Sequence, residues 1–387
     1  MRWRSSMKYT VLLVSNEEKK AVWDAYRQGK PFRVPVLIAT NPRIILLDPK
    51  LNTKGYTFER YFQDPYVMLE VQLQHTLYRA SVLHRYTDDP TGPPEVWRVG
   101  VDRQNIYEAA FFGAPIVYRP GQVPDTKPIL DDSNKERIFD VDIENPLERG
   151  FFREALEMCL RMKELAKGME FQGRPVEVLN YTPSGTDGPL TVAANLRGQG
   201  IFLDLLADPD YAMRLMAFIT QAAINRVYAL RRYWQDETIP VGLADDSVQL
   251  ISTKTYREMV MPHHRRFYDT FLPNKPRSIH LCGDATRHFR TMRDELNVRS
   301  FDTGFPVDFA WLRRELGPDV EILGGPPVSL LLHGTPEAVY ERTKEILLSG
   351  IKEGGRFILR EGNNLPPMTP EDNLAAMYKA CLDYGWY

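Results

Sequence analysis

The stretch SIHLCGDATRHFRTMRDELNVRSF, residues 278–301, shows the order of elements that decides the fold. An apolar run that ends on His280 and Cys282 predicts a buried strand, and the segment 286–296 predicts a helix. A second short strand is expected at 299–301. A strand, a helix and another strand in this order are typical of a parallel sheet, because parallel neighbours need a helical crossover between them.

The same alternation extends from this stretch in both directions. Toward the C-terminus we expect a helix at 309–316, a strand at 320–323, a helix at 336–348, a strand at 356–359 and a helix at 370–384. Before the stretch we expect a helix at 147–167, a strand at 176–180, a loop at 182–191, helices around 203–206 and at 209–235, a strand at 241–244 and a helix at 253–271. This regular alternation predicts a parallel α/β fold.

The first part of the chain adds strands at 33–40 and 96–101 and helices at 16–28 and 64–86. With the later strands the total is about eight, and eight βα units favour a closed (β/α)8 TIM barrel. A doubly wound open sheet would usually carry a glycine-rich phosphate loop after an early strand, and the sequence has none. We therefore expect one TIM-barrel domain over residues 1–387, with an N-terminal helical extension at 1–30.

Residues 111–145 are the least regular part of the sequence and predict a loop insertion. Four prolines, at positions 115, 120, 124 and 128, stand among acidic residues and lysines. Loops of this length often serve as lids or binding loops. A solvated connection is the other interpretation, and the sequence leaves both open.

Charges and cysteines narrow the class of protein. The 49 basic and 51 acidic residues give a net charge of −2, which offers no footprint for nucleic acid or an anionic membrane. Three scattered cysteines favour a reducing compartment, so we expect a cytoplasmic location. The N-terminus makes a poor signal peptide, and no window approaches the ~18 apolar residues that span a bilayer. We expect a soluble protein with small-molecule or protein partners, and its oligomeric state stays open.

The expected strands end in polar residues. In a βα barrel the catalytic groups lie at the C-terminal ends of the strands, so these residues are the natural candidates for a site. They are Asn180, Tyr181, Asp245, Asp246, His280, Cys282, Asp302, Glu361, Asn363 and Asn364.

His280 and Cys282 are candidates for a metal site. They lie two residues apart on a strand, so both side chains point to the same face. Imidazole and thiolate are preferred zinc ligands, and Asp302 or Glu361 could complete the set. The alternative is that Cys282 is a small buried hydrophobic residue and His280 a hydrogen-bonded polar one.

Asp245 and Asp246 form an acidic pair that could provide a general base or a cation-binding group. Adjacent strand residues point to opposite faces, so only one of the two is expected to face the site. Capping of a helix or pairing with an arginine is the alternative.

The other histidines offer less. His263 and His264 stand in MPHHRRFYD, residues 261–269, where a solvated helix face is expected rather than a ligand pair. Four further histidines have no chemical neighbour in the sequence and receive no role; they are His75, His84, His288 and His333.

Several segments together resemble the uroporphyrinogen decarboxylase superfamily, over about residue 176 to the C-terminus. They are, in order, NYTPSGTDGPLTVAANLRG with LLADPDYAMRLM, GLADDSVQLISTKTYREMVMPHHRRFYD, SIHLCGD, EILGGPPVSLLLHGTPEAVYERTKEIL and LPPMTPEDNLAAMYKA. The resemblance implies a (β/α)8 barrel and one of two activities. One is decarboxylation of the porphyrin precursor, and the other is methyl transfer.

The decarboxylase branch holds its acidic substrate with arginines in a motif of the form RQAGR near the start. This sequence reads ATNPRIILLD after its first expected strand, so only Arg43 offers a charge there. Decarboxylation of uroporphyrinogen itself is therefore not the expected activity.

The other branch is similar to zinc methyltransferases that exchange methyl groups between a corrinoid protein and a thiol or methylated substrate. The resemblance implies zinc at His280 and Cys282, followed by a later cysteine ahead of a Pro-Pro pair. Here the last strand continues as LREGNNLPPMTP, so Asn363 stands at the third ligand position. Asparagine is a poor zinc ligand. A carboxylate in its place would give a harder Lewis acid, which favours demethylation of an O-methyl substrate over thiol methylation.

The expected function is therefore a corrinoid-dependent methyltransferase, or demethylase, for a methylated small molecule. The sequence lacks the DxHxxG pattern of corrinoid modules, so the cobalamin is expected on a partner corrinoid protein. Asp245, Asp302 and Glu361 are the expected catalytic residues. The expected substrate-binding residues are Asn180, Tyr181, Asp246, Asn363 and Asn364. A lyase that decarboxylates another substrate, with Asp245 or Asp302 stabilising a cationic intermediate, is the alternative, and a non-catalytic binding role is a third.

Overall fold

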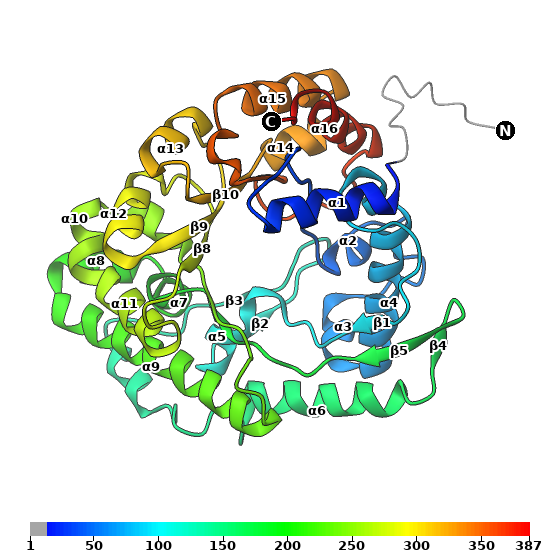
Figure 1. Ribbon diagram of the computed structural model, residues 1–387. Coiled ribbons are helices and arrows are strands. Elements are labelled where there is room, and N and C mark those ends of the chain that lie inside the picture. Colours follow the sequence, from blue (N-terminus) through cyan, green and yellow to red (C-terminus); the bar gives the residue numbers. More distant parts are fainter. Residues whose placement is uncertain (1–13) are drawn as a thin grey trace.

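A ring of short parallel strands with helices around it forms the frame of the molecule (Figure 1). The computed structural model describes residues 14–387. The chain runs once around the ring. The ring closes where the segment at 33–36 meets the C-terminal part of the chain: Arg33 pairs with Trp386, and Val36 pairs with Leu359. This architecture confirms the predicted (β/α)8 barrel.

The best-formed part of the ring is a four-stranded parallel sheet. Its order is β11 (Phe357–Leu359), β10 (Glu321–Gly324), β9 (Val298–Thr303) and β8 (Arg277–Leu281). A parallel bridge from Ala244 to His280 continues the ring to β7 (Gly242–Leu243), which pairs with β6 (Gly185–Thr186). The carboxyl ends of these strands therefore open on one face, where the polar residues were expected.

The strand expected at 33–40 is reduced to single bridges. Leu37 N donates to Leu359 O, and Leu359 N donates to Pro35 O. The segment thus lies where the first barrel strand belongs. Pro35 has no N–H to extend the ladder, which accounts for the interruption.

The third barrel strand is split in two. Its first half, β5 (Arg174–Val178), pairs with β1 (Trp97–Val99) and with the short β4 (Glu170–Phe171). Its second half is β6, so the loop expected at 182–191 holds a strand and the start of α7 (Pro189–Arg197). Gly188 makes this turn possible, because its φ is +85° and an added Cβ would lie 2.2 Å from Ala244 O.

Helices cover the outside of the ring, and their caps explain many of their starts. Asp64, Asp208 and Thr335 each cap a helix that has proline in its first turn. In residues 14–387, no helix combines the length and apolar character needed to cross a membrane. The α-helices not yet given are α1 (Asn16–Arg27), α2 (Arg43–Leu46), α3 (Phe58–Gln63), α4 (Pro65–Ser81), α5 (Tyr107–Phe111), α6 (Gly150–Leu165), α8 (Gly200–Ala207), α9 (Pro209–Trp234), α10 (Thr253–Thr255), α11 (Met261–Phe271), α12 (Thr286–Leu296), α13 (Phe309–Leu316), α14 (Val328–His333), α15 (Pro336–Leu348) and α16 (Glu371–Tyr384).

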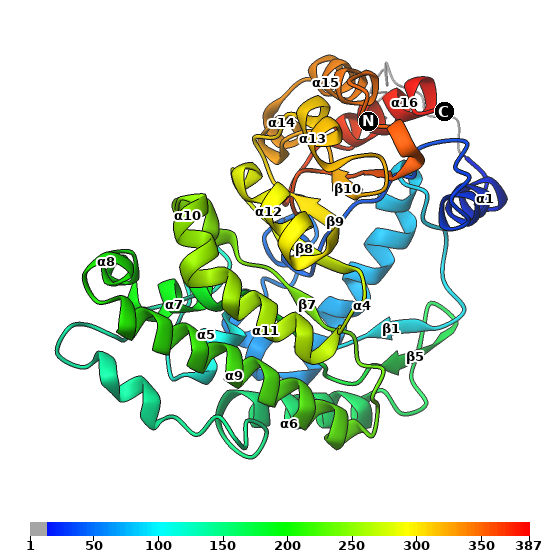
Figure 2. The ribbon, with the colours of Figure 1, turned by 60° about the vertical axis from the view of Figure 1, so that its left-hand side comes forward.

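The segment 111–145 is more ordered than a loop insertion suggests. It contains the hairpin of β2 (Ile116–Val117) and β3 (Asp125–Thr126) and the 3-10 turn η3 (Lys135–Asp140). Its second half packs along α7, α8 and α9, with α8 at the edge of the molecule (Figure 2).

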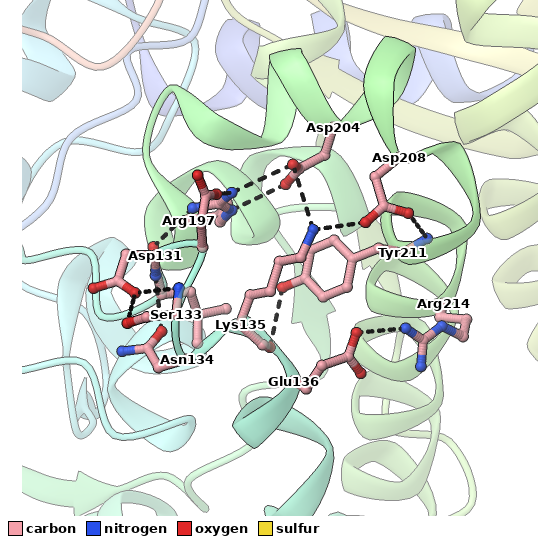
Figure 3. A network of polar contacts seen from close by, with 12 residues as sticks. Asp131, Ser133, Asn134, Lys135, Glu136, Arg197, Asp204, Asp208, Tyr211 and Arg214 are labelled. Atoms are coloured by element: carbon pink, nitrogen blue, oxygen red, sulfur yellow. Dashed lines mark hydrogen bonds and ion pairs between the residues drawn. The ribbon is translucent and has the colours of Figure 1, made fainter.

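Ion pairs hold this second half in place (Figure 3). The Lys135 ammonium lies between Asp208, at 2.6 Å, and Asp204, at 3.9 Å, and the Tyr211 hydroxyl donates to Lys135 O. Arg214 pairs with Glu136 at 2.7 Å. A lid that moves as a whole would have to break these ion pairs. The β2–β3 hairpin takes no part in them.

Candidate functional site

The site begins with the pairing of β8 and β9. These strands are parallel, and their register places His280 directly beside Asp302. The result is a hydrogen bond of 2.7 Å between His280 Nδ1 and Asp302 Oδ2. The other ring nitrogen, Nε2, is thereby directed at the Cys282 sulfur, 3.2 Å away.

Asn363 reaches the same sulfur from the end of the last strand. Its Nδ2 lies 3.1 Å from Cys282 Sγ, and its Oδ1 accepts a hydrogen bond of 2.7 Å from Asn364 N. That second bond fixes the orientation of the amide, so a donor and not an oxygen ligand faces the sulfur. Asn363 therefore lies at the position that the resemblance assigns to the third ligand, and its amide N–H faces the Cys282 thiol.

Asp246 completes a group of three potential ligands. Its Oδ1 accepts from Cys282 N at 2.6 Å. One ligand atom from each of Asp246, His280 and Cys282 lies within 4.8 Å of the others, and all three residues are partly exposed. We call these residues the three-residue cluster.

Arg360 connects the cluster to the end of the last strand. Its Nη1 donates to Asp302 Oδ2 at 2.8 Å, and its Nη2 donates to Glu361 Oε1 at 3.0 Å. Glu361 Oε1 also accepts from Ala39 N at 3.0 Å. Arg360 was not among the site residues expected from the sequence, although it stands next to Glu361 in LREGNN.

Two groups of this network have strongly shifted pKa values. Burial opposes the charged form of His280, but hydrogen bonds to Asp302 and Cys282 outweigh it and raise the pKa of His280 to about 10. Burial raises the pKa of Glu361 to about 8, against the opposing charge of Arg360. Glu361 therefore holds a proton at neutral pH, and its Oε2 is buried without a partner among residues 14–387.

The three-residue cluster fits zinc. Carboxylate, imidazole and thiolate are all zinc ligands, and a tetrahedral zinc holds nitrogen and sulfur ligands about 3.5 Å apart, near the 3.2 Å seen between His280 and Cys282. A ligating histidine almost always donates its other N–H to a carboxylate, a backbone carbonyl or a water molecule, and His280 donates to the Asp302 carboxylate. Asp302 thus has the position of a residue that orients the ligand.

Asp245 lies in a different environment. Its carboxylate is fully buried and accepts from Leu190 N at 3.2 Å, from Thr191 N at 2.8 Å and from Thr191 Oγ1 at 2.7 Å. It also bonds to His264 Nε2 at 2.9 Å. Asp245 therefore holds the first turn of α7 in place and does not join His280.

The expectation of a solvated helix face for His263 and His264 is wrong. Both are buried, with 6% and 0% exposure. A π-helical turn at Tyr256–Val260 precedes them. It adds a residue to the helix and rotates everything after it, which directs His264 into the core.

The remaining predicted residues lie apart from the cluster. Asn180 is exposed and accepts from the Lys163 ammonium. Tyr181 is buried, and its hydroxyl has no partner within residues 14–387. Asn364 is half-buried, and its backbone holds the Asn363 amide.

Two more ionisable groups lie near the cluster, and neither was expected as a site residue. Burial raises the pKa of Asp187 to about 8, and the carboxylates of Glu108 and Asp246 add to the shift. Burial lowers the pKa of Arg43, while the nearby Asp102 and Cys282 oppose that shift. Asp187 follows β6, so its position at a strand end was the signal that could have identified it.

Comparisons with known proteins bear on the family and the fold of the chain. The family model for uroporphyrinogen decarboxylase (URO-D) matches residues 105–384. The chain is 37% identical over 201 residues to the methylated-thiol–coenzyme M methyltransferase of Methanosarcina mazei, a match that covers 50% of this chain and 51% of the relative. It is 25% identical over 200 residues to the methylcobamide:CoM methyltransferase MtbA of the same organism, covering 51% and 57%.

The chain thus spans about half the length of the curated relatives it matches. A solved structure described as a methyltransferase from Methanosarcina mazei has a TM-score of 0.64 at 18% identity, over 95% of this chain and 98% of that chain. That likeness supports the barrel fold over almost the whole sequence.

Proposed function

The chain belongs to the uroporphyrinogen decarboxylase family, and from that premise we propose that it is a corrinoid-dependent methyltransferase. The three-residue cluster of Asp246, His280 and Cys282 carries the proposal. It would hold zinc, with the fourth position left for the substrate, as in catalytic zinc sites. The relatives named as methyltransferases support this class of reaction.

We propose a methyl group on oxygen as the donor. Two thiolates keep zinc electron-rich, which suits thiol chemistry, but this cluster offers one thiolate, one imidazole and one carboxylate. Zinc held in this way would draw electron density from the methyl-bearing oxygen as a Lewis acid. The C–O bond would break with its electron pair on the oxygen, and the methyl group would pass to the corrinoid of a partner protein.

The surrounding residues would orient ligands and supply the proton. Asp302 holds the His280 ring through the 2.7 Å bond, and Arg360 holds Asp302 through the 2.8 Å bond. Both are therefore positioning residues. Asp187 retains a proton near neutral pH and is partly exposed at a strand end, which suits a donor to the departing oxygen.

A methylated thiol is the second candidate donor. The relative with 37% identity is named for a methylated thiol, and it is the specific observation in favour. A decarboxylase without a corrinoid partner is the remaining alternative from the sequence.

The first test is metal content and methyl transfer. After zinc-replete expression we expect close to one zinc per chain, whereas less than about 0.1 would contradict the proposal. Purified protein is then mixed with free cob(I)alamin and paired methoxy and methylthio compounds, and the cobalamin absorbance is followed. Faster loss of the cob(I)alamin signal with the methoxy partner supports an oxygen donor. Release of carbon dioxide without any change in cobalamin would point to the lyase.

An engineered second thiolate tests the choice between oxygen and sulfur. Asn363→Cys replaces the amide beside Cys282 with a thiol, so we expect tighter zinc binding and a shift of preference toward methylthio donors. Asn364→Cys is the matched control, because Asn364 has no side-chain contact with the sulfur. An unchanged preference in Asn363→Cys would mean that the ligand set does not decide the donor.

A further inference from the structure

A cavity of about 500 Å³ lies beside α4, at the carboxyl ends of the first three barrel strands. We call it the α4 cavity. Its walls are α4, the turn at 40–42, the stretch 98–104 that includes and follows β1, and the stretch 179–183 after β5. The volume falls within the range of small-molecule sites. The described residues form no strand ladder between the 33–40 segment and β1. The cavity lies between these two segments.

The face that α4 turns to the cavity is polar. Gln72, His75, Thr76 and Arg79 are spaced at i, i+3, i+4 and i+7, and all four line the cavity. Residues with this spacing share one side of a helix, and in a barrel wall that side normally carries apolar residues against the strands. Gln72 donates to the Tyr61 hydroxyl and Thr76 donates to Gln72 O, which leaves His75 and Arg79 as the members of the stripe that are open to a ligand.

Several polar atoms in the walls are buried and lack partners. Tyr181 is 5% exposed and its hydroxyl bonds to nothing within residues 14–387, and the same holds for Nε2 of His75, which is 7% exposed. Arg103 is 9% exposed and its Nε is also unpaired. Buried polar groups without a partner cost stability, so a ligand is expected to satisfy them.

The charge of the cavity is positive. Arg79 makes no ion pair or hydrogen bond with any described residue, and Arg103 bonds only to the carbonyl oxygen of Phe62. The one carboxylate of the walls, Asp102, is occupied by hydrogen bonds from Gln104 and Tyr61. The two arginines are therefore left to bind an oxyanion.

The cavity borders the proposed reaction centre. Thr40 and Asn41 line it, and the preceding residue, Ala39, donates its N–H to Glu361 of the network around His280. Arg43, next in this turn, lies near both Asp102 and Cys282. A small molecule could thus place one end in the cavity and its methyl group at the cluster.

We propose that the α4 cavity binds a carboxylate of the methylated substrate, with Arg79 and the Tyr181 hydroxyl as donors. This inference rests on the proposed function, and it restricts the substrate class to O-methylated carboxylic acids. Neutral methyl ethers and bare methanol would lack the group that the cavity recognises.

Binding to metal-free protein tests the inference apart from catalysis. Methoxyacetate, 3-methoxybenzoate and 4-methoxybenzoate are each titrated calorimetrically beside the corresponding neutral amide. At least one acid is expected to bind about tenfold or more tightly than its amide. Equal binding of all acids and amides, or no binding of any acid, would overturn the inference. Neither result depends on zinc or cobalamin, so failure of methyl transfer remains a separate outcome.

Variants locate the effect. Arg79→Gln should remove the preference for the acid by about tenfold and leave amide binding unchanged. Arg85→Gln, the same change at an exposed position outside the cavity, should alter neither. A preference that survives Arg79→Gln would contradict the assignment.

The Tyr181 hydroxyl offers a second, independent measurement. Because it has no partner, Tyr181→Phe should leave the urea midpoint unchanged or higher while acid binding weakens by about fivefold or more. Tyr268→Phe is the control, since its hydroxyl donates to Ser278 O at 2.7 Å, and it should lower the midpoint without affecting binding. A fall in stability for Tyr181→Phe would show that the hydroxyl serves the fold and not a ligand.

Discussion

Two histidine–aspartate pairs lie at neighbouring strand ends of this barrel, and they differ in exposure. In the pair of His264 with Asp245, both side chains are fully buried. In the pair of His280 with Asp302, the side chains are 32% and 25% exposed. The two bonds have similar lengths, 2.9 Å and 2.7 Å, so the chemistry of the pair alone does not distinguish structure from function.

What distinguishes the pairs is the bonding capacity that each leaves unused. Asp245 accepts from two backbone N–H groups and one hydroxyl besides His264, and the other nitrogen of His264 contacts the Tyr256 hydroxyl at 3.2 Å. The pair of His280 with Asp302 leaves Oδ1 of Asp302 without a partner in the described part of the chain, and it directs an imidazole nitrogen at a thiol. A saturated pair stabilises the fold, and an unsaturated one can bind a ligand.

The largest expected effect comes from breaking the buried pair. Asp245→Ala removes a carboxylate that four donors share, so it should lower the free energy of unfolding by about 3–5 kcal/mol. Urea denaturation followed by circular dichroism measures the change. The neighbouring Asp246→Ala, at a partly exposed position, is the control and should cost about 1 kcal/mol. Equal losses in both variants would remove the distinction between the two regions.

The next effect concerns Glu361, which is fully buried and retains a proton at neutral pH. Its folded pKa of about 8 lies above its ordinary value of 4.5, so between these values the folded state binds the extra proton. The contribution of Glu361 to the free energy of unfolding is fully present below about pH 4.5 and is lost as the pH rises through 8. The expected loss from pH 5 to pH 8 is up to about 3 kcal/mol. Glu361→Gln should flatten that decline in metal-free protein. A variant with the same pH profile as the wild type would contradict the shifted pKa.

Removing the thiol tests the open region directly. Cys282→Ser should weaken zinc binding by about a hundredfold or more, and it should change the stability of metal-free protein by less than about 1 kcal/mol. Competition with a chromogenic chelator gives the affinity. Cys159→Ser is the matched control: Cys159 is fully buried, so that variant should lose stability and keep its zinc. Zinc retained by Cys282→Ser would exclude the three-residue cluster as the metal site.

The smallest effect is expected from the partner of His280. Asp302→Asn keeps the shape of the side chain but weakens its hold on the ring, so zinc affinity should fall about tenfold to a hundredfold. The same chelator competition applies. Asp294→Asn, which changes a surface carboxylate bound to Arg293, should leave the affinity unaltered. A loss as large as that of Cys282→Ser would mean that Asp302 is itself a ligand.

Much of the frame could be predicted from the sequence because it depends on local periodicity. The strands expected at 299–301, 320–323 and 356–359 match β9, β10 and β11 within a few residues. The expectation that polar strand ends meet at one face brought His280, Cys282 and Asp302 together correctly. Parallel register is enough for that, because it sets neighbouring strand ends side by side.

Orientation was harder to predict than position. β7 has two residues, too few to show which of Asp245 and Asp246 continues the pattern that faces inward. The π turn before His264 changes the helical phase without a signal in the sequence. Arg360 contacts Asp302 on β9, a group 58 residues away in the sequence, and only the folded chain reveals such a contact.

The ion pairs that fix residues 131–136 against α8 and α9 divide the 111–145 segment into an anchored part and a part that they do not hold. The hairpin turn at 119–122 is exposed and lies outside those anchors. Natural selection can therefore alter these four surface positions without disturbing the three-residue cluster or the barrel. Recognition of a new partner could evolve there while the chemistry is inherited unchanged.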